Sequence, residues 1–211
     1  LARDATWHRN HSTVAPVTPS AVPAILTGDL PEPDVVPVAS AHPDNLFTAL
    51  AATHEVHAVE SLTRLCPDDV CADRPTAPTR VVVRSLLGTA TDLWRERLSP
   101  ANEAEVDFTV SDQWFDPASA DRLVEFAPAL APSGDRPRLD FLHVLLPHQP
   151  WHLLPDGGEY EAPHPPPGAP YLSVWADQHA AEVARQRHLL QQQHVDGILG
   201  EVFDRMRQLG T

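Results

Sequence analysis

The segment Leu139–Leu146, which reads Leu-Asp-Phe-Leu-His-Val-Leu-Leu, is the most strand-like part of the 211-residue chain. It is almost continuously apolar, as expected of a strand that is covered on both faces of a parallel sheet. A second strand is predicted at Val56–Val59, and helical patterns separate and flank the two strands. Helices interleaved with buried strands indicate an α/β fold with an internal sheet, and the strand–helix–strand order is consistent with parallel crossovers.

Helices are predicted on either side of these strands. A short helix runs from Asn45 to about Ala52, behind an Asp44 cap. Another opens at Asp116-Pro117, and Pro128 is expected to end it. The longest helical pattern runs from Ala176 to Leu209. Its second half carries an apolar stripe at intervals of three and four residues, formed by Val195, Ile198, Leu199, Val202, Phe203, Met206 and Leu209.

The composition excludes several classes of protein. An apolar share of 42% excludes a generally disordered chain. The chain has 15 Lys and Arg residues against 29 Asp and Glu residues and contains no basic stripe, so nucleic acid is not an expected partner. All the cations are arginine, which excludes Schiff-base lysine and P-loop chemistry. The longest stretch without charged side chains, Asn10–Gly28, contains three prolines and therefore fails as a membrane-spanning helix.

Two cysteines, Cys66 and Cys71, flank the sequence Pro-Asp-Asp-Val. A tight proline turn could bring the two sulfurs together, so a Cys66–Cys71 disulfide is predicted, and with it an oxidising compartment. Two other interpretations stay open at this point. The pair could be half of a metal site, for which the chain has no second cysteine pair, or two reduced surface thiols.

Thr18 and His148 are the candidate catalytic residues. Thr18 opens a predicted short helix that ends at Gly28, and the positive end of a helix dipole favours an alkoxide and an incoming anion. His148 lies between two prolines after the strongest strand, at the sheet edge where α/β proteins bind ligands. It could protonate a leaving group or bind an anionic oxygen. The simpler interpretations are an ordinary helix N-cap for Thr18 and a loop histidine without a task for His148.

These segments, in this order, resemble the sulfatase and alkaline phosphatase superfamily, and most closely its membrane-anchored sulfatase-like branch. Sulfatases carry Cys/Ser-x-Pro-x-Arg and, after four more residues, Thr-Gly. Placing Thr27-Gly28 on that pair puts Thr18 at the nucleophile, and His148-Gln149-Pro150 matches the family's His-x-Pro at a strand end. The helix at Asn45–Leu50 and the segment Val195–Gly200 also fall in the family's order, so the resemblance covers essentially the whole chain.

The sequence departs from the sulfatase pattern both in the nucleophile motif and after Val59. The nucleophile position is threonine, and Ser20 and Val22 stand where sulfatases have the motif's proline and arginine, so conversion to formylglycine is not expected. A direct threonine nucleophile is similar to that of lipoteichoic acid synthases and phosphoethanolamine transferases, which form a phosphothreonine intermediate. Glu60-Ser61-Leu62 replaces the Gly-Lys-x-His of true sulfatases, so the sulfate-binding lysine and histidine are missing.

The resemblance implies an alkaline-phosphatase-like three-layer α/β sandwich with a mostly parallel sheet. Residues 1–211 would be the central part of the catalytic domain, without the family's first and last metal-binding strands. We therefore expect an internal fragment of a longer protein. Thr18 would be one ligand of a divalent metal ion (Ca, Mn, Mg or Zn) whose other ligands lie outside the chain. The fragment alone is then expected to bind no metal and to be inactive.

The implied function is that of an extracytoplasmic, metal-dependent sulfatase-like hydrolase or transferase. Its substrates would be sulfate or phosphate esters, either small molecules or lipid or glycan esters. It would act at the outer face of the cell membrane, with a membrane anchor in segments absent from this chain. The alternative is a catalytically inactive sulfatase-fold protein used for binding or assembly, which the missing sulfate-pocket residues favour. A coiled-coil surface on the C-terminal helix is a third hypothesis, which the two internal glycines of that helix disfavour.

Overall fold

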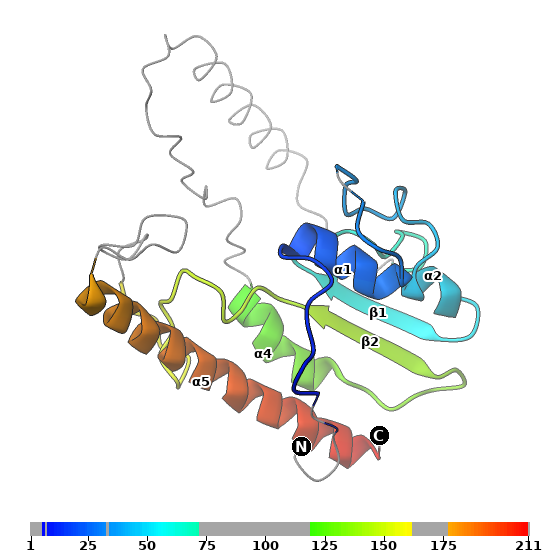
Figure 1. Cartoon of the computed structure of the whole chain (residues 1–211). Helices are drawn as coiled ribbons and strands as arrows, with labels where there is room; N and C mark the ends of the chain where they lie inside the picture. The colour runs from blue at the N-terminus through cyan, green and yellow to red at the C-terminus, as the bar shows by residue number, and fades with distance from the viewer. Residues whose placement is uncertain (1–5, 7, 33, 72–118, 162–176, 211) are drawn as a thin grey trace, which may run out of the picture. The chain divides into compact units, whose positions relative to one another are not determined.

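A computed structural model of the chain describes residue 6 and residues 8–32, 34–71, 119–161 and 177–210 (Figure 1). The chain divides into two compact units. The first unit comprises Leu1–Ala72, Pro117–Leu146 and Val195–Thr211, and the second comprises Asp73–Asp116 and Pro147–His194. The long helix α5 (Gln178–Leu209) contributes its first part to the second unit and its last part to the first.

The first unit is a mixed α/β structure whose described strands form a two-stranded parallel sheet. β1 (Glu55–Glu60) pairs with β2 (Arg138–His143), in a register that sets Ala58 beside Phe141. Both predicted strands and their parallel direction are confirmed. The predicted extent of the second strand is wrong, because β2 ends at His143 and not at Leu146. Its residues are also only half-buried, and not covered on both faces.

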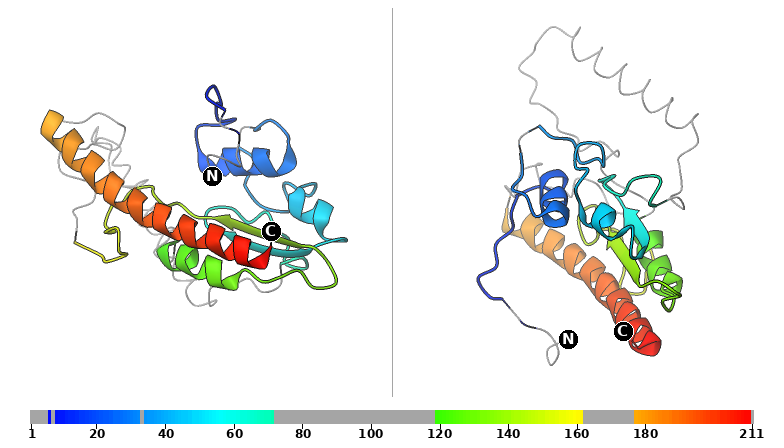
Figure 2. Two further views of the ribbon diagram at one scale, coloured as in Figure 1. Left: turned by 90° about the horizontal axis from the view of Figure 1, so that it is seen from below. Right: turned by 90° about the vertical axis from the view of Figure 1, so that its right-hand side faces the viewer.

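One face of this sheet carries an apolar core. Helices α1 (Thr18–Thr27) and α2 (Leu46–Leu50) lie over that face (Figures 1 and 2). The buried cluster consists of Val22, Leu26, Phe47, Val56, Leu65, Cys66 and Cys71. Phe47 is fully buried, and its ring meets the edge of the Phe141 ring with centroids 5.2 Å apart. Burial of these side chains fixes both helices on the sheet.

The Thr-Gly pair ends α1. The Thr27 hydroxyl donates a hydrogen bond to the Pro23 carbonyl oxygen at 3.0 Å. Gly28 has a φ of 80°, a left-handed conformation that favours glycine, and its N–H donates to the Ala24 carbonyl oxygen at 2.9 Å. Thr27-Gly28 is therefore a helix terminus in this chain.

Asn45 caps α2, and the prediction that Asp44 would do so is wrong. The Asn45 Oδ1 accepts hydrogen bonds from two backbone N–H groups of the first turn at 2.9 and 3.2 Å, and the Thr48 hydroxyl accepts one from the Asn45 N–H at 3.0 Å. The Asn45 Nδ2 donates to the Leu65 carbonyl oxygen at 3.0 Å. This buried side chain therefore ties the start of α2 to the segment that follows β1.

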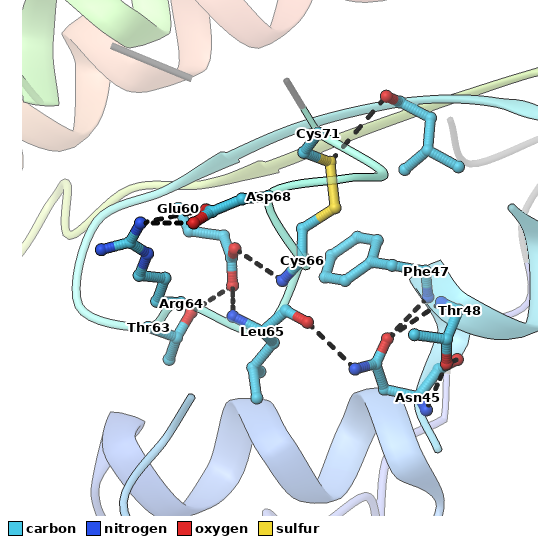
Figure 3. The surroundings of a disulfide bond; sticks show 11 residues. Asn45, Phe47, Thr48, Glu60, Thr63, Arg64, Leu65, Cys66, Asp68 and Cys71 are labelled. Carbon is cyan, nitrogen blue, oxygen red and sulfur yellow. Dashed lines mark hydrogen bonds and ion pairs between the residues drawn. A yellow bond between two sulfur atoms is a disulfide. The ribbon is translucent and has the colours of Figure 1, made fainter. Parts of the chain in front are cut away.

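Cys66 and Cys71 form a disulfide with their Cα atoms 6.0 Å apart, which confirms the prediction and rules out the metal-site and free-thiol interpretations (Figure 3). Glu60, the last residue of β1, holds the same loop. Its carboxylate accepts hydrogen bonds from the Leu65 N–H at 2.8 Å, the Cys66 N–H at 3.1 Å and the Thr63 hydroxyl at 2.8 Å. The end of β1 and the disulfide loop therefore form one hydrogen-bonded corner.

Helix α4 (Ser119–Ala129) lies on the side of the sheet opposite to α1 (Figure 2). It packs against the end of α5 within the first unit, where Arg205 donates to the Leu130 carbonyl oxygen at 3.1 and 3.0 Å. The apolar contact is formed by Ala127, Leu130 and Val202, with Phe126 and Leu209 against them. Pro128, which was expected to end the helix, is its second-last residue. The predicted start at Asp116-Pro117 lies outside the described residues.

Helix α5 confirms the predicted C-terminal helix, although its apolar stripe is only partly buried. Ile198 and Val202 are buried, whereas Leu199 and Met206 are exposed. Neither α5 nor any other helix in the described part of the chain is long and apolar enough to cross a membrane.

Candidate functional site

Thr18 is the first residue of α1 and is half-buried, at the helix N-terminus as expected. Val17 is the N-cap and makes no side-chain capping bond, so the interpretation of Thr18 as an ordinary N-cap is wrong. The Thr18 hydroxyl makes no hydrogen bond with any residue that the structure describes. A free hydroxyl at the positive end of a helix dipole is suited to carry developing negative charge.

The first turn of α1 offers an anion few backbone donors. Pro19 has no N–H, and the N–H groups of Ser20 and Ala21 both point at the Val17 carbonyl oxygen, at 3.1 and 2.9 Å. Of these first four helical residues, only Thr18 keeps a backbone N–H without a described partner. An anion at this helix end would therefore be stabilised by the helix dipole and by Thr18, and not by hydrogen bonds from several backbone N–H groups.

A groove of about 600 Å³ lies beside α1, but Thr18 does not line it. Polar side chains from α1 and from the loop after it reach this groove: Ser20, Thr27, Asp29, Glu32, His42 and Asp44. Three of these side chains are carboxylates, and no arginine is among the lining residues. Because like charges repel, this groove is unsuited to a sulfate or phosphate ester. Ester chemistry at Thr18 would take place outside it.

His148 lies in the second unit and is exposed. The prediction that it directly follows the strand is wrong, because residues 144–147 separate it from β2. Its Nδ1 lies 2.7 Å from the Gln149 carbonyl oxygen. Since a carbonyl oxygen only accepts, this contact places a hydrogen on Nδ1 and leaves Nε2 bare in the neutral ring. His148 can then donate from Nε2 to an ester oxygen only when its ring carries a second proton.

Gln191, on α5, holds the loop that carries His148. Its Nε2 donates to the His148 carbonyl oxygen at 2.8 Å. Its Oε1 accepts from the backbone N–H groups of His152 at 3.2 Å and Leu153 at 3.4 Å. The Gln191 side chain is fully buried. The sequence does not reveal this residue, because it lies within the polar run Gln191-Gln192-Gln193 and carries no apolar signal.

Aromatic side chains stiffen the same loop. The Trp151 indole N–H donates to the Pro147 carbonyl oxygen at 3.1 Å, and the indole contacts the His188 ring of α5 with centroids 5.6 Å apart. The Tyr160 hydroxyl donates to the Trp151 carbonyl oxygen at 3.0 Å. The loop backbone on both sides of His148 is therefore anchored by side chains.

Polar side chains also gather in the first unit where the two strands end. Glu60 is the register partner of His143, and the Ser61 hydroxyl donates to the His143 carbonyl oxygen at 3.0 Å. The Nδ1 of His143 is buried and has no hydrogen-bond partner among the described residues. Carboxyl ends of parallel strands are where α/β sheets bind ligands, but the apolar residues after His143 hide the strand end in the sequence, so His143 was not among the predicted site residues.

Burial lowers the pKa of His143 from its ordinary value of 6.5, and the negative charge of Glu60 opposes this shift. Below pH 6.5 the unfolded chain therefore binds more protons at this residue than the folded chain does. The free energy of unfolding is expected to fall as the pH drops below that value. Urea unfolding from about pH 7 to about pH 5 should show a shallower pH dependence for His143→Asn than for the unmodified protein. An equal pH dependence of the unfolding free energy in the two proteins would contradict the lowered pKa of His143.

No group of three or more His, Cys, Asp or Glu side chains that could hold an ion occurs among the described residues. That Thr18 is a ligand of a divalent metal ion stays a prediction. Thr18 belongs to the first unit and His148 to the second, so the expectation that both face one cleft stays a prediction.

No known protein family, curated protein or solved structure matches this chain. The resemblance to sulfatases rests on the sequence motifs, and what it implies about activity is therefore a proposal.

Proposed function

We propose that this chain is the central part of the catalytic domain of an extracytoplasmic hydrolase or transferase of the sulfatase and alkaline phosphatase superfamily. It would act on sulfate or phosphate esters, with Thr18 as the nucleophile. The observation that carries this proposal is the Thr18 hydroxyl at the start of α1, which makes no hydrogen bond with any described residue, in a helix that ends at Thr27-Gly28. In sulfatases the nucleophile stands at the same spacing from Thr-Gly.

Two further features support the proposal. A parallel sheet with α1 and α2 on one side and α4 on the other is in keeping with a three-layer α/β sandwich (Figure 2). The Cys66–Cys71 disulfide is in keeping with an oxidising, extracytoplasmic compartment.

The proposed reaction proceeds in two displacements. The Thr18 Oγ1 attacks the phosphorus or sulfur atom, the bond from that atom to the alcohol oxygen of the substrate breaks, and a threonine ester forms. The proton lost by the Thr18 hydroxyl is balanced by the proton that the departing alcohol oxygen gains. Water, or a second alcohol in a transferase, then attacks the threonine ester and restores the Thr18 hydroxyl.

His148 has a defined part in this proposal. With its Nδ1 hydrogen directed at the Gln149 carbonyl oxygen, the protonated ring presents an Nε2–H to the ester. That group would either bind a non-bridging oxygen or protonate the departing alcohol. A divalent metal ion would polarise the same oxygens in such a reaction. No group of three or more acidic, histidine or cysteine side chains in the described part of the chain could hold that ion. Thr18 is the one ligand that we propose from this chain.

A catalytically inactive sulfatase-fold protein remains the alternative, and Glu60 favours it. The segment Glu60-Ser61-Leu62 stands where true sulfatases have sulfate-binding residues. The Glu60 carboxylate is instead engaged by Thr63, Leu65 and Cys66, and it would repel an anionic ester (Figure 3). A protein that had kept the fold for binding would have no need of a sulfate pocket.

An activity measurement tests the proposal against this alternative. The protein at its full natural length is assayed with a chromogenic phosphodiester and a chromogenic sulfate ester, each with Mg²⁺, Mn²⁺, Ca²⁺ or Zn²⁺. We expect metal-dependent turnover of at least one ester and strong loss of turnover in His148→Asn. Absence of turnover in every combination would favour the inactive relative. Full turnover in His148→Asn would remove His148 from the mechanism.

A further inference from the structure

We infer that Gln191 positions His148 for the reaction by fixing the backbone on both sides of Pro150. This inference rests on the proposed function, because it assigns Gln191 to the same site. Three contacts carry it: one donated hydrogen bond to the His148 carbonyl oxygen and two accepted from the N–H groups of His152 and Leu153.

The amide nitrogen and the amide oxygen of Gln191 both hydrogen-bond to the loop that carries His148. The amide nitrogen contacts His148 and the amide oxygen contacts the chain four and five residues later, so the side chain spans the turn that presents the histidine. A side chain that bridges two points of a turn restricts its backbone more than a bond at either point alone, because both contacts must break before the turn can shift.

Gln191 is a polar side chain in a fully buried position, where an apolar side chain would be expected if packing were its only role. Of the other buried residues of α5, Ala184, Ile198 and Val202 are apolar and His194 is polar, whereas Gln191 is the one polar side chain there that is fully buried. Burying an amide is unfavourable unless it is hydrogen-bonded. An apolar side chain would suffice if this position only had to be filled. The amide is therefore explained by what it holds, which is the loop of His148.

His148 depends on this anchor because its own ring is exposed. The described ring contact of His148 is to the carbonyl oxygen of the adjacent Gln149, which belongs to the same turn. The position of the ring is then set by the turn, and Gln191 is the residue of α5 that hydrogen-bonds to the turn on both sides of Pro150. Misplacing a catalytic group by about 1 Å can lower turnover by about 100-fold.

Hydrogen exchange tests the anchoring without any activity. Gln191→Met keeps a side chain of similar length and helix propensity but removes all three hydrogen bonds. We expect the amides of His152 and Leu153 to exchange at least about 10-fold faster in this variant, with unchanged exchange in β1 and β2. The matched control is Gln192→Met, on the exposed next position of the same helix. Unchanged exchange of both amides in Gln191→Met would overturn the inference.

A double-mutant cycle tests whether Gln191 acts through His148. In the full-length protein, Gln191→Met is expected to lower kcat by about 10- to 100-fold with little change in KM. Added to His148→Asn, it should lower kcat no further, because the group that it positions is already gone. If the kcat loss of the double variant equalled the product of the two single losses, Gln191 would not act through His148. If Gln191→Met fails to fold, Gln191→Glu replaces it, since the carboxylate still accepts from both amides but cannot donate to His148 when ionised.

The two experiments separate this inference from the proposed function. If the unmodified protein turns over no ester, the proposed function fails, while hydrogen exchange still decides whether Gln191 fixes the loop. If the protein is active and the exchange of His152 and Leu153 does not respond to Gln191, the inference fails while the proposed function stands.

Discussion

Thr18→Ala is expected to abolish ester turnover, lowering kcat by roughly 1,000-fold or more, while Thr18→Ser retains a measurable fraction. Alanine removes the oxygen that forms the covalent bond, whereas serine supplies the same atom without the extra methyl group. Because the Thr18 hydroxyl makes no capping bond, neither change should alter the urea unfolding midpoint noticeably. Initial-rate assays of the folded full-length variants with metal present give the measurement.

Ser20→Ala is the matched control for this prediction. Ser20 carries the next hydroxyl of α1 and lines the acidic groove that Thr18 does not reach, so its loss should leave kcat nearly unchanged. Full activity in Thr18→Ala would remove Thr18 as the nucleophile. Loss of activity in Ser20→Ala with retention in Thr18→Ala would transfer the role to Ser20.

Phe47→Ala is expected to lower the free energy of unfolding by about 3 to 5 kcal/mol. Phe47 is fully buried in the cluster that joins α1 and α2 to the sheet, and its ring packs edge-on against Phe141 at 5.2 Å. Alanine leaves a cavity that the surrounding helices and strands can close only in part. Urea denaturation at neutral pH measures the difference from the unmodified protein.

Leu46→Ala serves as the control for the core prediction. Leu46 precedes Phe47 in α2, but it is 38% exposed, so truncating its side chain should cost no more than about 1 kcal/mol. Equal losses in the two variants would show that α2 is not held to the sheet through Phe47.

The features that were predicted correctly from the sequence are those that depend on residues close together in the chain. β1 follows from a short run of strand-forming residues, and α5 from apolar residues that recur at intervals of three and four, each within a single segment. The Cys66–Cys71 disulfide follows from a short spacing across a proline turn. The N-terminal position of Thr18 follows from the helix that Thr27-Gly28 terminates. In each case the deciding residues lie within a few positions of one another.

The features that sequence analysis missed depend on contacts between distant parts of the chain. Asn45 bonds to Leu65, 20 positions away, and Gln191 bonds to His148, 43 positions away. A polar residue gives no hydrophobic signal, so its burial cannot be read from periodicity before its partner is known. The end of β2 at His143 was missed for a related reason, because the apolar residues after it continue the pattern of the strand.

The most direct test of the account is to locate the covalent intermediate. The full-length protein with its metal is mixed with a phosphodiester or sulfate ester, quenched in acid within the first turnovers and digested, and its peptides are sequenced by mass spectrometry. The account predicts one phosphoryl or sulfuryl group on Thr18, absent from Thr18→Ala. Turnover with Thr18 unmodified, or with the group on another residue, would contradict it.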